Sequence, residues 1–327
     1  MSWNQFEEYI KSIHSNQAPK ICLVIGAGIH LLLNKLPNGT SYEAAVRLSS
    51  WNGLMDNVNS EFSKKYPLPL VWELSVQDAD ELEMGDSLPT HKKENKLLQA
   101  LSQEIKSSED IIFANQNLFK QYSPLIRVLN SGCVSDVISL NFDLIAERLF
   151  SNAPFTDANQ NTILVSRMSA NRILVGENNH SIRFWHPHGD RTNNEQLILG
   201  PWRYGQVLVE MNETRNTIKQ DEKMDYDLFK QRVFASPNNW LELMMFRPLV
   251  FLGTGLDQAD LTMWHALLIR QRNYAKAEPK SKKPKAWRLG IPGELDHVPS
   301  DWILSLEAAD YPNAWAFLEA AVGIQPA

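Results

Sequence analysis

The hydrophobic pattern predicts that the chain opens with a helix and then enters a buried strand. Between Phe6 and Ile13, apolar residues recur at helical spacing with charged residues between them, which is typical of an amphipathic helix that docks on a core. The run from Lys20 to Ile25 is short, continuous and rich in branched side chains. Such a run favours a strand of a parallel sheet that is covered on both faces. This strand would end directly at Gly26.

A strand followed by a turn and a helix is predicted at two further places. The run Val134–Leu140 leads into a helix that begins near Leu144, and the run Pro248–Leu252 ends in Gly253-Thr254-Gly255 before a helix that begins at Leu261. Repeated units of this kind build open α/β sheets. The expected fold is therefore α/β, with a doubly wound, mostly parallel Rossmann-like sheet and a helical insertion over about residues 51–130.

The remaining segments complete the expected organisation. Short strands are predicted at Thr162–Val165, Ser181–Trp185 and Gln196–Leu199. Residues 276–285 contain five lysines and two prolines, which is typical of a solvated loop. We interpret residues 1–275 as one domain, and residues 286–327 as a C-terminal strand and helices that pack on it. Helices are expected around Trp302–Leu304 and around Trp315.

Composition narrows the class of protein. With 327 residues, of which 43% are hydrophobic, the chain can bury a sizeable core. Its net charge of −6 argues against direct nucleic-acid binding or coating of an anionic membrane. The two cysteines, Cys22 and Cys133, exclude a disulfide framework and a four-cysteine metal site. Without a signal-peptide pattern or a long apolar window, we expect a cytoplasmic protein that does not enter the membrane.

The first chemical signal is the turn Gly26-Ala27-Gly28-Ile29 after the first strand. Glycines let the backbone approach a pyrophosphate, and free amides at a helix start donate hydrogen bonds to it. The alternative is a tight turn with no ligand. A conventional dehydrogenase is disfavoured, because Ile29-His30-Leu31 replaces the third glycine of the dinucleotide fingerprint and the nearest following acid is Glu43.

Two further segments carry groups suited to catalysis. Asn141 and Asp143 follow a predicted strand, and ligands bind at the carboxyl ends of strands in open α/β sheets. Either residue could instead cap the next helix. In His186-Pro187-His188-Gly189-Asp190, a histidine that titrates near neutrality could accept a proton from a ribose hydroxyl or from water. We predict His188 as this base and His186 as a packing or hydrogen-bonding partner.

These segments, in this order, resemble the sirtuin-like superfamily, and most closely its bacterial antiphage-defence branch, which hydrolyses NAD. The resemblance covers roughly residues 20–265. It implies that NAD contacts nine positions, namely Gly26, Ala27, Gly28, Ile29, Asp143, Gly253, Thr254, Gly255 and Asp260. It also implies that Asn141 orients the attacking water and ribose hydroxyls and that His188 is the general base. Asp143 would hold the nicotinamide carboxamide, and no metal is required. A Trp51 and Leu54 pair is similar to a structural pair of that branch.

The chain also departs from the family pattern. Deacylase sirtuins carry a four-cysteine zinc module, which two cysteines cannot build, so NAD hydrolysis is the expected activity. His30, Ser139 and Gly255 stand where many relatives have serine, threonine and serine. Two alternatives stay open: a catalytically silent subunit that binds NAD or ADP-ribose, and a zinc-free protein deacylase or ADP-ribosyltransferase. The branch further implies control through a homo-oligomer or a separate sensor or activator protein.

Overall fold

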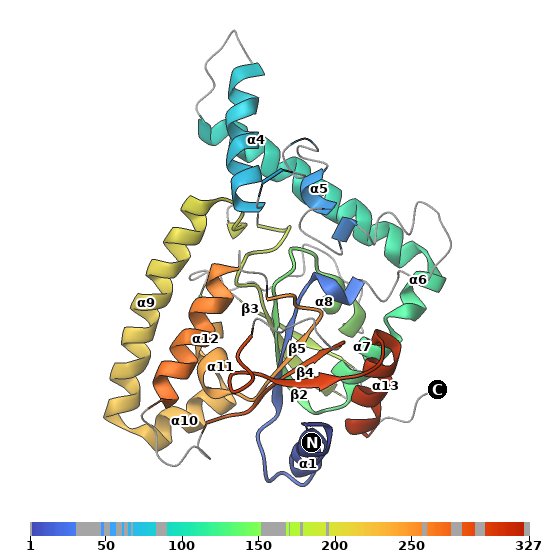
Figure 1. Ribbon diagram of the computed structural model, residues 1–327, viewed down its shortest axis with the longest axis vertical. Coiled ribbons are helices and arrows are strands. Elements are labelled where there is room, and N and C mark those ends of the chain that lie inside the picture. The colour runs from blue at the N-terminus through green and yellow to red at the C-terminus, as the bar shows by residue number, and fades with distance from the viewer. Residues whose placement is uncertain are drawn as a thin grey trace.

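A seven-stranded sheet runs through the centre of the protein in the computed structural model (Figure 1). The structure describes residues 2–30, 47–48, 53–56, 61, 65–66, 68–82, 90–151, 168–169, 171–176, 179–193, 196–256, 260–275, 283–291 and 298–323. The strands lie in the order β3-β4-β2-β1-β5-β6-β7. Their bounds are β1 Ile21–Ile25, β2 Val134–Ser139, β3 Asn171–Val175, β4 Ser181–Trp185, β5 Leu249–Leu252, β6 Ala286–Gly290 and β7 Leu304–Glu307. Among the strands of the described ranges, only β3 runs antiparallel to a neighbour, β4.

The register of the central strands brings the ends of β1, β2 and β5 to one level. Ile25 at the end of β1 pairs with Ser139 of β2 on one side and with Leu252 of β5 on the other. Because the three strands are parallel, the segments after them leave from the same edge of the sheet. We call this the carboxyl edge. β4 ends nearly level with it, since Trp185 pairs with Ile138.

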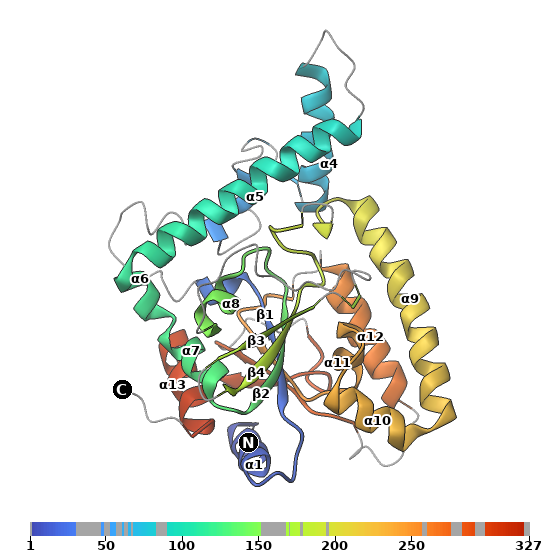
Figure 2. The same ribbon diagram turned by 180° about the vertical axis from the view of Figure 1, so that it is seen from behind.

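Helices cover both faces of the sheet and form two separate cores (Figure 2). Leu23 and Ile25 of β1 point into the first core, and Cys22 and Val24 point into the second, as alternation along a strand requires. The first core is built with α1 Ser2–His14, α4 Leu68–Leu82, α5 Thr90–Ala114, α6 Gln116–Gln121, α7 Ser123–Asn130, α8 Ile145–Phe150 and α13 Tyr311–Ala321. The second is built with α9 Pro201–Met224, α10 Tyr226–Ala235, α11 Trp240–Phe246 and α12 Leu261–Tyr274.

This architecture confirms an α/β fold with a mostly parallel sheet flanked by helices, consistent with a Rossmann-like fold. The predicted strands at 20–25, 134–140, 181–185 and 248–252 are present as β1, β2, β4 and β5. Within residues 51–130, the described elements are all helical, from α4 to α7. Figure 1 shows α4 and the long α5 at one end of the molecule, above the helices that flank the sheet. No helix of the described ranges is long and apolar enough to cross a membrane.

Two element predictions are wrong, and one lies outside the described residues. Leu197–Leu199 are buried but form no strand; their one backbone bond to the neighbouring loop runs from Ile198 N–H to His188 O at 2.9 Å. Trp302 lies in a turn, and the residues from Leu304 form strand β7, so the C-terminal segment adds two strands, β6 and β7, where we expected one. Short apolar runs do not separate helix, strand and buried loop by pattern alone. Thr162–Val165 lie outside the described residues.

Candidate active site

The predicted glycine turns after β1 and β5 pack directly against each other. Gly26 N–H donates to Leu252 O at 3.0 Å, and Gly28 N–H donates to Gly253 O at 2.8 Å. A Cβ on Gly28 would lie 2.7 Å from Gly253 O, so only glycine allows this approach. Ile29 points into the first core, with 1% of its surface exposed. These glycines therefore join the two turns, and their contact with NAD stays a prediction.

Replacing Gly253 with alanine is expected to destabilise the fold by about 2–4 kcal/mol. Gly253 has a φ of 60°, and a Cβ there would lie 2.4 Å from Ile29 N, so both strain and a backbone clash oppose the side chain. Urea unfolding measures the cost. The control is Gly205→Ala in α9, where no described atom other than the helix's own backbone lies within 4 Å of the new Cβ. That variant should be stabilised by about 0.5–1 kcal/mol, since glycine is a poor helix residue.

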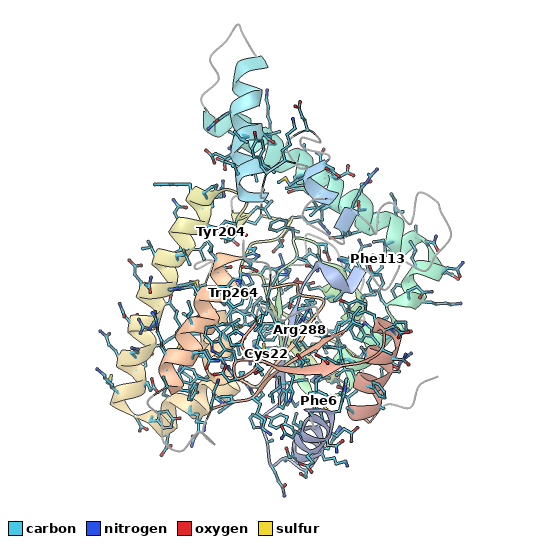
Figure 3. All side chains as sticks on the ribbon, viewed as in Figure 1. Phe6, Cys22, Phe113, Tyr204, Trp264 and Arg288 are labelled. Carbon is cyan, nitrogen blue, oxygen red and sulfur yellow. The ribbon has the colours of Figure 1, made fainter. Side chains whose placement is uncertain are left out.

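Two buried polar atoms at the carboxyl edge lack a hydrogen-bond partner among the described residues: Asn141 Nδ2 and Thr254 Oγ1. Asn141 follows β2 and is 7% exposed; Thr254 follows β5 and is 4% exposed. The backbone of each residue is engaged, because Asn141 N–H donates to Ser139 Oγ at 3.3 Å and Thr254 O accepts from Arg288 Nε at 3.2 Å (Arg288 is labelled in Figure 3). Nine other buried side-chain atoms of the described residues also lack a partner, so it is the position of these two, after the strands on either side of β1, that makes a ligand there a reasonable hypothesis.

Asp143 is held between a helix start and a histidine. Its Oδ1 accepts the N–H of Ile145, the first residue of α8, at 3.0 Å, although the N-cap position itself is Leu144, which makes no side-chain cap bond. Its Oδ2 lies 3.1 Å from Nε2 of His30, whose Nδ1 is 2.7 Å from the hydroxyl of Tyr122. Burial opposes ionisation of Asp143, but His30 and the Ile145 N–H hold the pKa of its carboxyl below the usual value. His30 thus links the turn after β1 to the segment after β2.

His188 faces α12 and is 1% exposed. Its Nε2 lies 2.6 Å from Thr262 Oγ1 and 3.4 Å from Asp260 Oδ1, and Thr262 Oγ1 in turn donates to Asp260 Oδ1 at 2.7 Å. The ring of Tyr204, labelled in Figure 3, lies with its centroid 5.9 Å from that of His188. Asp260 also caps α12 by accepting the N–H of Met263 at 3.1 Å. The structure therefore brings together His188 and Asp260, which the sequence predicted as separate base and NAD contact.

Replacing Asp260 with asparagine is expected to cost about 1–3 kcal/mol of unfolding free energy at neutral pH, because a charged partner of His188 is lost while the cap is kept. Burial would raise the pKa of Asp260, but His188 and Thr262 hold it below the usual value. Such a group stabilises the fold above its unfolded pKa of about 3.9 and loses this effect as the pH falls through its folded pKa. The difference from wild type should therefore vanish in acid.

Urea unfolding between neutral and acidic pH measures this difference. The control is Asp310→Asn, because Asp310 caps α13 through Asn313 N–H at 2.8 Å but is exposed. Asparagine caps as well as aspartate, so this control should change stability by less than about 0.5 kcal/mol at any pH. A cost for Asp260→Asn that stays constant down to acidic pH would contradict the assignment.

The sequence did not reveal a buried charged cluster beside the site. Glu109 of α5 is fully buried and accepts from Arg191 Nε at 2.8 Å, from Arg191 Nη2 at 2.9 Å and from Leu144 N–H at 2.8 Å. Arg191 directly follows the predicted histidine segment, and Leu144 follows Asp143. The position of Arg191 was a usable signal. Glu109 gave none, since one acid among the many charges of a predicted helix looks like solvated surface.

The other predicted contacts are less constrained. Gly255 is exposed, and no described atom lies within 4 Å of a Cβ built on it. Leu54 is buried in the first core, whereas Trp51 lies outside the described residues. Across the described ranges, no three His, Cys, Asp or Glu side chains gather in a way that could hold a metal ion.

Comparison with known proteins adds no assignment. No model of a protein family matches this chain, and no curated protein matches it either. Only the motifs and the geometry of the carboxyl edge therefore bear on the function.

Proposed function

We propose that this protein is an NAD hydrolase that cleaves the bond between nicotinamide and ribose and releases nicotinamide and ADP-ribose. One observation carries the proposal: Asn141 Nδ2 and Thr254 Oγ1 are buried, lack partners among the described residues, and follow the two strands that flank β1. A ligand between them would meet the glycine turn after β1. This is where the resemblance places NAD.

The strand order supports this location. The chain passes from β1 to β2 on one side and later returns to β5 on the other side of β1. We propose that the sheet is doubly wound, with a crevice at this reversal, because open α/β sheets bind nucleotides at such points. The N–H of Gly26 is bonded to Leu252 at the end of β5 and that of Gly28 to Gly253 after it, so both amides are engaged, and Thr254 would supply the hydrogen bond to the ligand. Gly255 is exposed, and the described residues would leave room for a phosphate there.

The proposed reaction needs few catalytic groups from the protein. The cationic nicotinamide of NAD is a good leaving group, so the bond breaks through an oxocarbenium-like ribose that water then attacks. Asn141 would orient that water and the ribose hydroxyls, and Asp143 would hold the carboxamide. His188 would accept the proton of the water. Its Nδ1 faces Leu140 O at 3.4 Å, which is long for a hydrogen bond.

The biological setting follows from the resemblance alone. We propose that the protein acts in the cytoplasm as an effector of antiphage defence through depletion of NAD. An enzyme of this kind would harm its own cell if it were always active. We therefore propose control by self-assembly or by a separate sensor or activator protein.

A catalytically silent NAD-binding subunit is the second candidate, and the burial of the His188 side chain favours it. Its ring is 1% exposed, and both of its nitrogens face protein atoms. A base must release one of these contacts before it can take a proton from water. In this reading, Asn141 and Thr254 bind NAD or ADP-ribose without turnover.

The deciding experiment quantifies NAD, nicotinamide and ADP-ribose in cells that express the protein, with and without phage infection. The comparison is with the double variant Asn141→Ala/His188→Ala. Depletion of NAD by the wild type alone, with matching nicotinamide and ADP-ribose, supports the hydrolase. An unchanged NAD concentration in every condition, together with NAD binding by the purified protein, supports the silent subunit instead. Level NAD without binding refutes both.

A further inference from the structure

Both ring nitrogens of His186 face oxygen atoms. Nδ1 lies 3.1 Å from the backbone oxygen of Asn141, and Nε2 lies 2.5 Å from Oε1 of Glu147 in α8. The side chain is buried, with 5% of it exposed, and Glu147 is fully buried. A carbonyl has no proton to give, and neither has an ionised carboxylate. With Glu147 ionised, as in its ion pair with Arg172 at 3.9 Å, His186 satisfies both contacts only when each nitrogen carries a proton, that is, as an imidazolium.

The charges around His186 favour this form. Glu147 of α8, Asp190 after β4 and Asp143 after β2 all act on the ring, and Arg172 of β3 is the opposing cation. Arg172 is itself bonded to Asp190 at 2.7 Å and lies 3.9 Å from Glu147. Burial lowers the pKa of His186, but Glu147 and Asp190 outweigh it and raise the pKa above the usual value. Glu147 Oε2 has no hydrogen-bond partner among the described residues, so His186 is its principal donor.

The two histidines of the segment have different neighbours. The chain turns after β4, with Gly189 N–H donating to His186 O at 3.0 Å, so the ring of His186 faces α8 and the ring of His188 faces α12. Each Nδ1 approaches one of two successive carbonyls, Leu140 O for His188 and Asn141 O for His186. The backbone of Asn141 is therefore contacted on both sides of its Cα, by His188 at the preceding carbonyl and by His186 at its own carbonyl.

We propose that His186 is a positioning residue, whose imidazolium holds the Asn141 carbonyl and thereby aims the Asn141 amide at the substrate. This inference rests on the proposed NAD hydrolysis. When the ring loses a proton, the remaining N–H stays with the charged acceptor Glu147, and the lone pair of Nδ1 then faces the Asn141 carbonyl. Two lone pairs repel, and Asn141 moves. Hydrolysis should therefore fall at alkaline pH, above the ordinary histidine pKa of about 6.5.

The test is the pH profile of kcat for NAD hydrolysis by the purified full-length protein. His186→Asn supplies an amide nitrogen in the place of Nδ1 and cannot titrate, so it should keep activity within about 10-fold and lose the alkaline fall. His186→Ala should lose about 10²-fold in kcat with a smaller change in KM, because the position of Asn141 is no longer fixed. Glu147→Gln removes the anion that raises the pKa and should move the fall to lower pH. His180→Asn, before β4, is the control with an unchanged profile.

An alkaline fall that persists unchanged in His186→Asn overturns the inference, and so does full activity in His186→Ala. Thermal unfolding of each variant shows whether a loss of activity reflects loss of the fold. Nitrogen-15 NMR of labelled histidines gives a readout that needs no turnover: one ring with two protonated nitrogens should persist above neutral pH in the wild type and be missing in His186→Asn.

The two readouts separate the inference from the proposed function. If the wild type hydrolyses no NAD under any condition, the proposed function fails and the catalytic role of His186 fails with it. The NMR signal then decides whether the contact with Asn141 exists as an imidazolium. If NAD is hydrolysed but the doubly protonated signal is missing, the hydrolase stands and the inference about His186 is overturned.

Discussion

Replacing Asn141 with alanine is expected to lower the rate of NAD hydrolysis by about 10²–10³-fold while leaving the free energy of unfolding almost unchanged. Removal of one oriented group that acts on the transition state has this effect on rate in other enzymes. The fold should not suffer, because Nδ2 has no partner among the described residues and the backbone bonds of Asn141 remain. Nicotinamide release and urea unfolding of the same preparation measure the two quantities.

Asn239→Ala is the matched control for this prediction. Asn239 is also buried, but its side chain caps α11 by accepting the N–H of Glu242 at 2.9 Å. Its loss should cost about 1 kcal/mol of unfolding free energy and leave hydrolysis unchanged. If Asn141→Ala instead loses stability like Asn239→Ala and keeps its rate, Asn141 is structural, and the proposal loses the observation that carries it.

The candidate site could be predicted from the sequence where local pattern decides the structure. The strands β1 and β5 are short runs rich in branched side chains, and each is followed by a glycine. Parallel pairing then places both turns at one edge of the sheet. The sequence could not show why these turns need glycine. Gly28 and Gly253 are close in space because the two turns touch, which depends on a register between strands more than 200 residues apart.

The distinction between His186 and His188 also required the structure. A continued strand would have placed both side chains on one face. The strand instead ends at Trp185, and the turn that follows sends one ring to Glu147 and the other to Thr262. Partners of this kind, many residues away, leave no trace in local spacing. The same holds for Glu109, whose role depends on where α5 crosses the site.

Replacing Glu109 with alanine is expected to cost about 3–5 kcal/mol of unfolding free energy, the largest stability effect that we predict. The pair with Arg191 itself adds little, because burial raises the pKa of Glu109 even though Arg191 opposes this shift. The cost arises from what is left behind. Arg191 would stay buried and lose the carboxylate to which Nε and Nη2 donate, Arg148 would lose one of its two acids, and Leu144 N–H would lose its acceptor.

Lys106→Ala on the same helix is the control for Glu109→Ala. Lys106 pairs with Asp110 at 2.6 Å, but both side chains are about half exposed, so its loss should cost about 0–1 kcal/mol. The double variant Glu109→Ala/Arg191→Ala should cost less than the sum of the single variants, since it also removes the stranded cation. Urea unfolding of the four proteins tests both expectations. Additive costs, or a cost for Glu109→Ala as small as that for Lys106→Ala, would show that α5 does not hold the segments around Asn141 and His188 through this pair.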